Sequence, residues 1–241
     1  MATRLLLLFS REPRRQADEK GLRGRAGEQL FTAFARGWLD AARLAQARLV
    51  VSAPRADHAG WRRCLPAEEI AFLEQRGSSF GRRLEDAARQ AAELRGHAVL
   101  VGGDVAPAPE ILAAAFDLLE NGADAVLGPA PDGGVSLVAL PAEDLDLLRG
   151  LAPRRFDVFS RLSKSLRARG RILRVVAPAP DVDGRRQLGR LLRRRFSTPD
   201  LEALARDALA LKAWSPTLAR LPVPSRPHSD PEASRAPPSA S

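Results

Sequence analysis

Two apolar strands each run into a glycine-and-aspartate turn: His97-Ala98-Val99-Leu100-Val101-Gly102-Gly103-Asp104 and Ala125-Val126-Leu127-Gly128-Pro129-Ala130-Pro131-Asp132-Gly133-Gly134. Glycine and aspartate are common in turns for local reasons, so either stretch alone indicates only the end of a strand. In an open α/β sheet, ligands bind in the crevice outside the carboxyl ends of the strands. The recurrence of the pattern therefore predicts a ligand cleft at one edge of a sheet.

Apolar runs alternate with helical segments along the rest of the chain. Strands are expected at residues 5–9, 48–52, 97–101, 123–127, 135–140 and 172–176. Amphipathic spacing or capping residues predict helices at 26–45, 82–94, 109–122, 141–150, 157–169 and from Pro199, whose N-cap would be Thr198. Residues 11–25 are expected to form a loop, and 58–75 are ambiguous, with a first helical turn predicted at 66–69. The alternation predicts one α/β domain with a mostly parallel sheet and helices on both faces.

The length of the chain and its ending set the domain boundary. The 241 residues are long for one domain and short for two. After Leu221 the chain becomes rich in proline and serine, a composition that buries too little apolar surface to order itself. We therefore expect one domain over residues 1–221 and a disordered tail over residues 222–241.

Cysteine content and hydropathy indicate the compartment. The single cysteine, Cys64, excludes an intrachain disulfide and a cysteine-rich metal site, as is typical of a reducing cytosol. The apolar run at residues 5–9 is too short for a signal peptide, and no stretch approaches the roughly 20 apolar residues of a membrane span. A soluble cytoplasmic protein is expected.

The positive charge of the chain is carried mainly by arginine. The net charge is +9, and lysine occurs only at positions 20, 164 and 212. Arginine suits bidentate contacts with phosphate-bearing ligands, although arginine in place of lysine is also typical of a genome-wide compositional bias. The chain lacks a helix-turn-helix, zinc-finger or RNA-recognition signature, so we expect no nucleic-acid partner.

Five motifs occur in an order and spacing typical of one known family. The family pattern Gly-Pro-Ala-x-Asp-Gly-Gly-Tyr is matched by Gly128-Pro129-Ala130-Pro131-Asp132-Gly133-Gly134-Val135, where only the aromatic residue is lost. Gly-Ser-Asp-Cys-Pro corresponds to Gly102-Gly103-Asp104-Val105-Ala106, and Gly-Asp-Leu-Gly-Glu-Arg-Leu to Ser78-Ser79-Phe80-Gly81-Arg82-Arg83-Leu84. The closing Asp-Val-Asp is present at residues 181–183, and the opening Phe-x-Lys-x-Pro is echoed from Phe9 to Pro13.

Through these motifs, over residues 4–192, the chain resembles a bacterial family of glycosyltransferase-like proteins, some of which are called arsenosugar-biosynthesis glycosyltransferases. It is also similar to the nucleotidyltransferases that load guanylyl groups onto phospholactate and molybdopterin. The resemblance implies the GT-A fold, the single Rossmann-type domain of nucleotide-diphospho-sugar transferases.

The opening loop departs most from the family. It reads Arg11-Glu12-Pro13-Arg14-Arg15-Gln16-Ala17-Asp18-Glu19-Lys20-Gly21-Leu22, so a Pro-Gly pair and a Lys-Thr-Arg triplet are missing. Glu19 stands at the position of a family lysine, where phosphate oxygens are expected. If the loop still holds a nucleotide, then Arg11, Arg14, Arg15 and Lys20 must replace the missing cations.

The resemblance implies the candidate site residues. Asp104 and Asp183 would hold Mg²⁺ or Mn²⁺, because a hard cation prefers oxygen ligands. Asp132 would be the catalytic residue and Gly133 and Gly134 would line the sugar or acceptor pocket, although this segment also fits a hairpin turn. The nucleotide-binding candidates are Arg11, Arg15, Lys20, Gly81, Arg83 and Gly103. Asp181 is interpreted as the end of a strand.

Three functions remain open. The first hypothesis is a metal-dependent glycosyltransferase that joins a nucleotide-activated sugar to a small-molecule acceptor. The second is a nucleotidyltransferase on the same fold, which the missing triplet disfavours because a triphosphate needs more cationic contacts. The third is a catalytically degenerate homologue that acts as a binding or scaffold module. The sequence leaves the base, the sugar, the acceptor and the oligomeric state undetermined.

Overall fold

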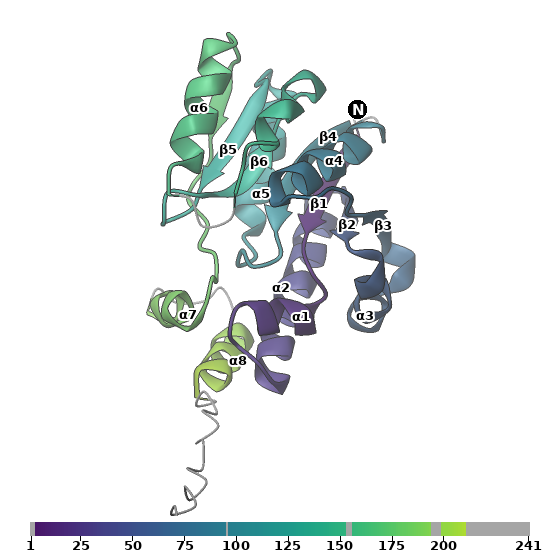
Figure 1. Ribbon diagram of the computed structural model, residues 1–241, viewed down its shortest axis with the longest axis vertical. Coiled ribbons are helices and arrows are strands. Elements are labelled where there is room, and N and C mark those ends of the chain that lie inside the picture. Colours follow the sequence, from purple (N-terminus) through teal and green to yellow (C-terminus); the bar gives the residue numbers. More distant parts are fainter. Residues whose placement is uncertain (1–2, 95, 153–155, 194–198, 211–241) are drawn as a thin grey trace, which may run out of the picture. The chain divides into compact units, whose positions relative to one another are not determined.

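The computed structural model describes residues 3–94, 96–152, 156–193 and 199–210, which form one α/β unit around a seven-stranded sheet (Figure 1). Its strands are β1 (Thr3–Phe9), β2 (Ala47–Ala53), β3 (Ile70–Glu74), β4 (Gly96–Gly102), β5 (Ala125–Pro129), β6 (Val135–Ala139) and β7 (Leu173–Val175). Their order is β3-β2-β1-β4-β6-β5-β7. Strand β6 pairs antiparallel with both neighbours, and the other pairs are parallel, so the predicted mostly parallel sheet is confirmed.

Strand β1 lies in the middle of the parallel half and is buried on both faces. Leu6 and Leu8 belong to one hydrophobic cluster, and Leu5 and Leu7 belong to another. Successive side chains of a strand point to opposite faces, so a continuous run of leucine supplies both sides of the sheet. The sequence of β1 therefore requires a layer of helices on each face.

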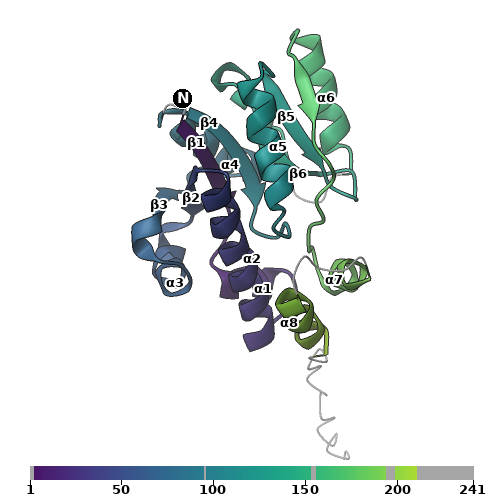
Figure 2. The same ribbon diagram turned by 180° about the vertical axis from the view of Figure 1, so that it is seen from behind.

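The helices supply those two layers. Helices α2 (Arg25–Leu44) and α5 (Pro109–Glu120) cover one face, where Trp38 and Phe116 pack fully buried (Figure 2). Helices α4 (Phe80–Ala92) and α6 (Val158–Ala168), with the 3-10 helix Ala142–Leu148, cover the other face. Gly122 and Gly170 follow α5 and α6 with φ of +89° and +74°, as expected for glycines that end helices.

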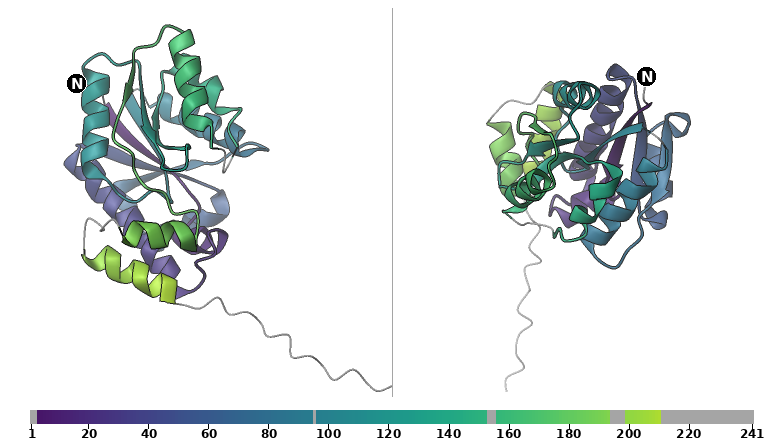
Figure 3. Two further views of the ribbon diagram at one scale, coloured as in Figure 1. Left: turned by 90° about the vertical axis from the view of Figure 1, so that its left-hand side faces the viewer. Right: turned by 90° about the horizontal axis from the view of Figure 1, so that it is seen from above.

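A third hydrophobic cluster lies beside the carboxyl ends of the parallel strands. It joins α1 (Pro13–Glu19) and the first half of α2 to α7 (Arg185–Leu192) and α8 (Pro199–Ala210). Phe31, Phe34 and Leu188 are among its buried side chains. Figure 3 shows α7 and α8 next to each other beside α2. The cluster thus packs the two helices that follow β1 against the two helices that follow β7.

Three segments differ from the sequence-based expectations. Residues 13–19 form helix α1, although a loop was predicted, because Pro13 occupies the first turn and Gln16 and Ala17 are buried. Residues 70–74 form β3 after a single 3-10 turn, and α7 had no predicted counterpart. The predicted cap Thr198 and the domain boundary after Leu221 lie outside the described residues.

None of the helices in the described part of the chain is both long enough and apolar enough to span a membrane.

Candidate functional site

A pocket of about 840 Å³ opens at the carboxyl ends of β1 and β4 and at the start of β6. One side is apolar and includes Phe9 and Phe80, whose rings meet edge to face with centroids 5.7 Å apart. The other side carries charged residues from the segments that follow β1, β4, β5 and β7. The location is the predicted one, because parallel strands end at the same edge of the sheet.

Backbone hydrogen bonds join the segment after β7 to the segment after β4. The Val182 N–H donates to the Asp104 carbonyl (2.8 Å), and the Ala106 N–H donates to the Pro180 carbonyl (3.0 Å). Val105 forms an isolated antiparallel bridge with Asp181. The indole N–H of Trp38 donates to the Val105 carbonyl (3.0 Å) and so fixes this segment to α2. These bonds hold Asp104 close to the Asp-Val-Asp stretch.

Asp132 lies on the tight connection of the β5–β6 hairpin. Its Oδ1 accepts a hydrogen bond from the Gly134 N–H (2.8 Å). Gly133 has φ of +90°, and a Cβ there would lie 2.1 Å from the Phe156 carbonyl oxygen, so only glycine fits. The segment forms the connection of a hairpin, and Asp132 and Gly134 line the pocket, whereas Gly133 is not among the pocket-lining residues.

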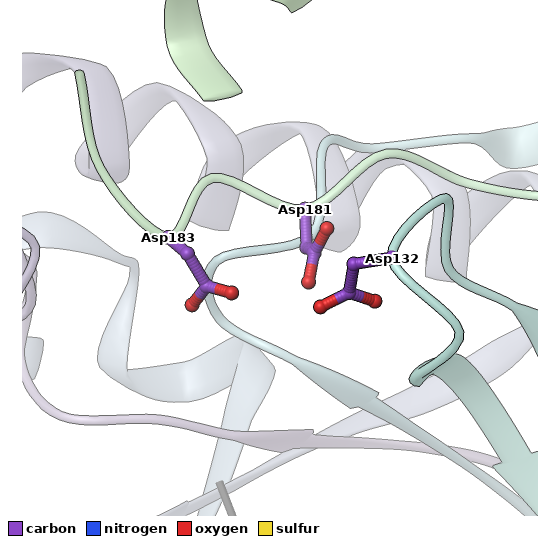
Figure 4. A group of neighbouring side chains, drawn as sticks. All are labelled: Asp132, Asp181 and Asp183. Carbon is purple, nitrogen blue, oxygen red and sulfur yellow. The ribbon is translucent and has the colours of Figure 1, made fainter. Parts of the chain in front are cut away.

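Three carboxylates converge on one point of the pocket. One oxygen from each of Asp132, Asp181 and Asp183 lies within 4.8 Å of the others (Figure 4). Burial, followed by the charges of Asp104, Asp132 and Asp183, raises the pKa of Asp181 to about 7. A group of carboxylate oxygens that repel one another is the donor set that a hard divalent cation prefers. These residues therefore fit the cation that the fold implies.

Lys20 contacts one member of this triad, Asp183, and also contacts Asp104. Its ammonium donates to Asp104 Oδ2 and Asp183 Oδ1. The side chain of Lys20 is only 14% exposed. Burial lowers the pKa of Lys20, but the two carboxylates outweigh burial and leave that pKa above its ordinary value. Lys20 is thus a charged lysine that bridges the two residues predicted from sequence as metal ligands.

The arginines of the opening loop are held by carboxylates. Asp57, which is fully buried, accepts from Arg11 Nε (2.7 Å) and the Glu12 N–H (3.1 Å) and forms an ion pair with Arg15 Nη1 (2.8 Å). Arg11 Nη1 also pairs with Glu19 at 2.6 Å. Arg11 lines the pocket, but much of its hydrogen-bonding capacity is used inside the protein.

The remaining candidates divide between the pocket and the core. Arg83 lines the pocket, and no ion-pair partner for it is found within the described ranges. Gly81 faces the carbonyls of residues 148, 149 and 151, where a Cβ would lie 2.3–2.7 Å from their oxygens. Gly103 likewise packs against Ser10, and a Cβ there would lie 2.0 Å from the hydroxyl. Neither Gly81 nor Gly103 is among the pocket-lining residues, so the structure places both in close packing.

The sequence gives little indication of Asp181, which belongs to the site, or of Asp57, which holds two arginines of the opening loop. Local sequence indicates Asp181 only as the end of a strand, although Asp181 and Asp183 are two residues apart, a spacing that puts both side chains on one side of an extended segment. Asp57 had no motif to indicate its role. Its partners, Arg11 and Arg15, are more than 40 residues away in the chain.

A family model described as "Uncharacterized protein conserved in bacteria (DUF2064)" matches residues 38–155. The comparison with curated proteins gives no match.

Solved structures share the fold. A candidate nucleotide-diphospho-sugar transferase from Desulfovibrio desulfuricans G20 aligns with a TM-score of 0.74 and 23% identity over 87% of this chain and 97% of that one. The inositol-1-phosphate CTP transferase from T. maritima aligns with a TM-score of 0.53 and 10% identity over 86% of this chain and 97% of that one. The 4-diphosphocytidyl-2C-methyl-D-erythritol synthase from Anaerococcus prevotii DSM 20548 aligns with a TM-score of 0.52 and 9% identity over 86% of this chain and 98% of that one. The predicted GT-A-like fold is confirmed.

Proposed function

We propose that the protein is a transferase that takes a nucleotide-activated sugar and a divalent cation, Mg²⁺ or Mn²⁺, in this pocket and passes the sugar to a small-molecule acceptor. The observation that carries the proposal is the convergence of Asp132, Asp181 and Asp183 at the ligand-binding edge of a GT-A-like sheet. A half-buried lone cysteine, Cys64, supports a reducing compartment such as the cytoplasm.

The pocket suits such a donor in size and in chemistry. Its volume of about 840 Å³ lies within the range of about 300–1,000 Å³ typical of small-molecule sites. Phe9 and Phe80 offer an apolar wall for a base or a sugar ring. Arg83, which forms no ion pair with an acid in the described part of the chain, is placed on α4 to meet a phosphate group.

The chain's own residues would act by positioning and by charge. Asp132, Asp181 and Asp183 would hold the cation, and the Gly134 N–H keeps the Asp132 carboxylate turned toward it. When bound, a divalent cation supplies positive charge to the diphosphate leaving group. Arg83 would add a second positive charge, and the apolar wall would exclude water from the donor.

The distribution of cations favours a sugar-nucleotide donor over a nucleoside triphosphate. Arg11 and Arg15 are already paired with Asp57, and Lys20 is paired with Asp104 and Asp183. A triphosphate carries more negative charge than a diphosphate sugar and needs more free cations. Nucleotidyl transfer is therefore the second candidate, supported by two of the similar solved structures.

Thermal unfolding with ligands tests the proposed function. UDP- and GDP-sugars, with and without Mn²⁺, are compared with CTP and GTP. A ligand at about 100 times its Kd stabilises the native state by about 2.7 kcal/mol, which raises Tm by about 5–10 °C in a domain of this size. We expect the largest rise with a sugar nucleotide and Mn²⁺ together.

Matched variants locate the response. Asp132→Asn should remove the Mn²⁺-dependent part of the rise, whereas Asp207→Asn, an exposed aspartate on α8 outside the pocket, should leave it intact. A larger rise with a triphosphate would favour nucleotidyl transfer. If no nucleotide raises Tm in any condition, the scaffold hypothesis replaces the enzyme.

A further inference from the structure

Lys20 is unusual in its residue type and in its place. Lysine occurs at only three positions in a chain whose positive charge is mostly arginine. Lys20 follows the last residue of α1 and extends into the pocket, where its ammonium contacts one oxygen each of Asp104 and Asp183. A lysine ammonium is a compact point charge, so it resembles a metal ion more closely than a guanidinium does.

The charges around Lys20 are unbalanced. Asp104, Asp132 and Asp183 all act electrostatically on Asp181, so four carboxylates share one region. Within the described ranges, Lys20 is the cation that pairs with this group, while Arg11 and Arg15 pair with Asp57. The single ammonium charge of Lys20 thus faces four carboxylates and contacts two of them, Asp104 and Asp183.

The triad that fits a divalent cation and the ion pairs of Lys20 have one residue in common, Asp183. Asp183 belongs to the triad that fits a divalent cation and also accepts from Lys20, whereas Asp104 contacts Lys20 and is absent from the triad. Within the described part of the chain, Lys20 forms no hydrogen bond to Asp132 or Asp181. A divalent cation held by the triad would therefore share Asp183 with the ammonium of Lys20, and the two positive charges would repel each other.

We propose that Lys20 is a fixed cation that neutralises Asp104 and competes with a divalent cation for Asp183. Lys20 thereby limits the four-aspartate cluster to one divalent ion. The inference rests on the proposed function only in taking Mn²⁺ or Mg²⁺ as the cation of the triad. Lys20 keeps the cluster folded without metal and lowers its affinity for metal.

Metal binding alone, without nucleotide, tests the inference. Wild type, Lys20→Met and Lys164→Met are freed of metal with a chelator and titrated with Mn²⁺ by calorimetry. Lys164 is an exposed lysine on α6 and serves as the matched control. We expect one Mn²⁺ per wild-type chain, a Kd at least about tenfold lower in Lys20→Met, and an unchanged Kd in Lys164→Met. Two ions per wild-type chain, or an unchanged or higher Kd in Lys20→Met, would overturn the proposal.

Metal-free melting is the second readout. Lys20→Met leaves Asp104 and Asp183 without their cation, so its Tm in chelator should fall by several degrees, and adding Asp104→Asn should restore part of that loss. An unchanged Tm would contradict the role of Lys20 as a counter-ion.

The double variant also guards against a single variant that fails to fold. Lys20→Met with Asp104→Asn removes one charge of each sign and keeps the triad, so it should bind Mn²⁺ at least as tightly as wild type. Weaker binding by the double variant would show that Asp104 is itself a principal metal ligand and would overturn the proposal. Absence of Mn²⁺ binding in every variant overturns this inference and the metal site together. A normal Mn²⁺ response without any nucleotide binding overturns only the proposed function.

Discussion

Replacement of Asp181 by asparagine is expected to stabilise the metal-free protein above neutral pH. Burial and three neighbouring aspartates raise the pKa of Asp181 to about 7 in the folded protein, against 3.8 in the unfolded chain. Between these two values the folded state holds a proton that the unfolded state has released. Stability therefore falls as the pH rises through this window, and the full penalty is present above pH 7.

The size of the effect follows from the two pKa values. A rise from 3.8 to about 7 corresponds to about 4 kcal/mol if it is fully expressed. Asp181 is half-buried rather than fully buried, and four carboxylates share the repulsion, so we expect about 1–2 kcal/mol. In a domain of this size, such a gain raises Tm by about 2–8 °C.

Unfolding is measured in chelator at about pH 5 and about pH 8.5, on either side of the folded-state pKa. Near pH 5 the unfolded carboxyl is already ionised while the folded one is still protonated, so only part of the penalty is present and Asp181→Asn should exceed wild type in Tm by less than at the higher pH. Near pH 8.5 the variant should melt higher, and Asp207→Asn should match wild type at both values. A variant that melts lower than wild type at the higher pH would refute the account of Asp181 as a crowded, unbalanced carboxylate.

Two further substitutions test the opening loop. Asp57→Ala should lower the free energy of unfolding by about 2–3 kcal/mol, because it leaves Arg11, Arg15 and the Glu12 N–H without a buried acceptor; a loss under about 0.5 kcal/mol in urea unfolding would contradict this. Glu19→Gln should tighten the binding of UDP or GDP with Mn²⁺ by about three- to tenfold in calorimetry, because it removes a negative charge and frees Arg11 Nη1. Weaker binding by Glu19→Gln would show that this face of the loop is turned away from the ligand.

The sheet and the placement of the aspartates follow from local sequence. The apolar runs of β1, β4 and β5 each carry enough buried aliphatic residues to indicate a strand without outside help. Asp104 and Asp132 follow their strands directly, so an α/β order places them at one edge. That edge could be predicted because it depends on chain order and on a period of two.

Short or partly exposed elements gave weaker signals. Helix α1 spans only seven residues, too few for an apolar period to appear among its charges. Strand β3 pairs with β2 alone at the edge of the sheet, and only Ile70 in it is buried. The pairing of Lys20 with Asp104 joins residues 84 positions apart, and no local pattern encodes such a contact.

The opening loop shows why the departures from the resembled family point to a remodelled site rather than an eroded one. Glu19 stands where that family has a lysine, and the structure pairs Glu19 with Arg11 instead of leaving it against the cluster. The adjacent Lys20 reaches Asp104 and Asp183. An eroded site that lost its cations would leave these aspartates to repel one another in a half-buried pocket, at a cost that substitution to neutral residues would relieve. The chain instead keeps all four carboxylates and places one of its three lysines among them, which favours a site that still binds a cation.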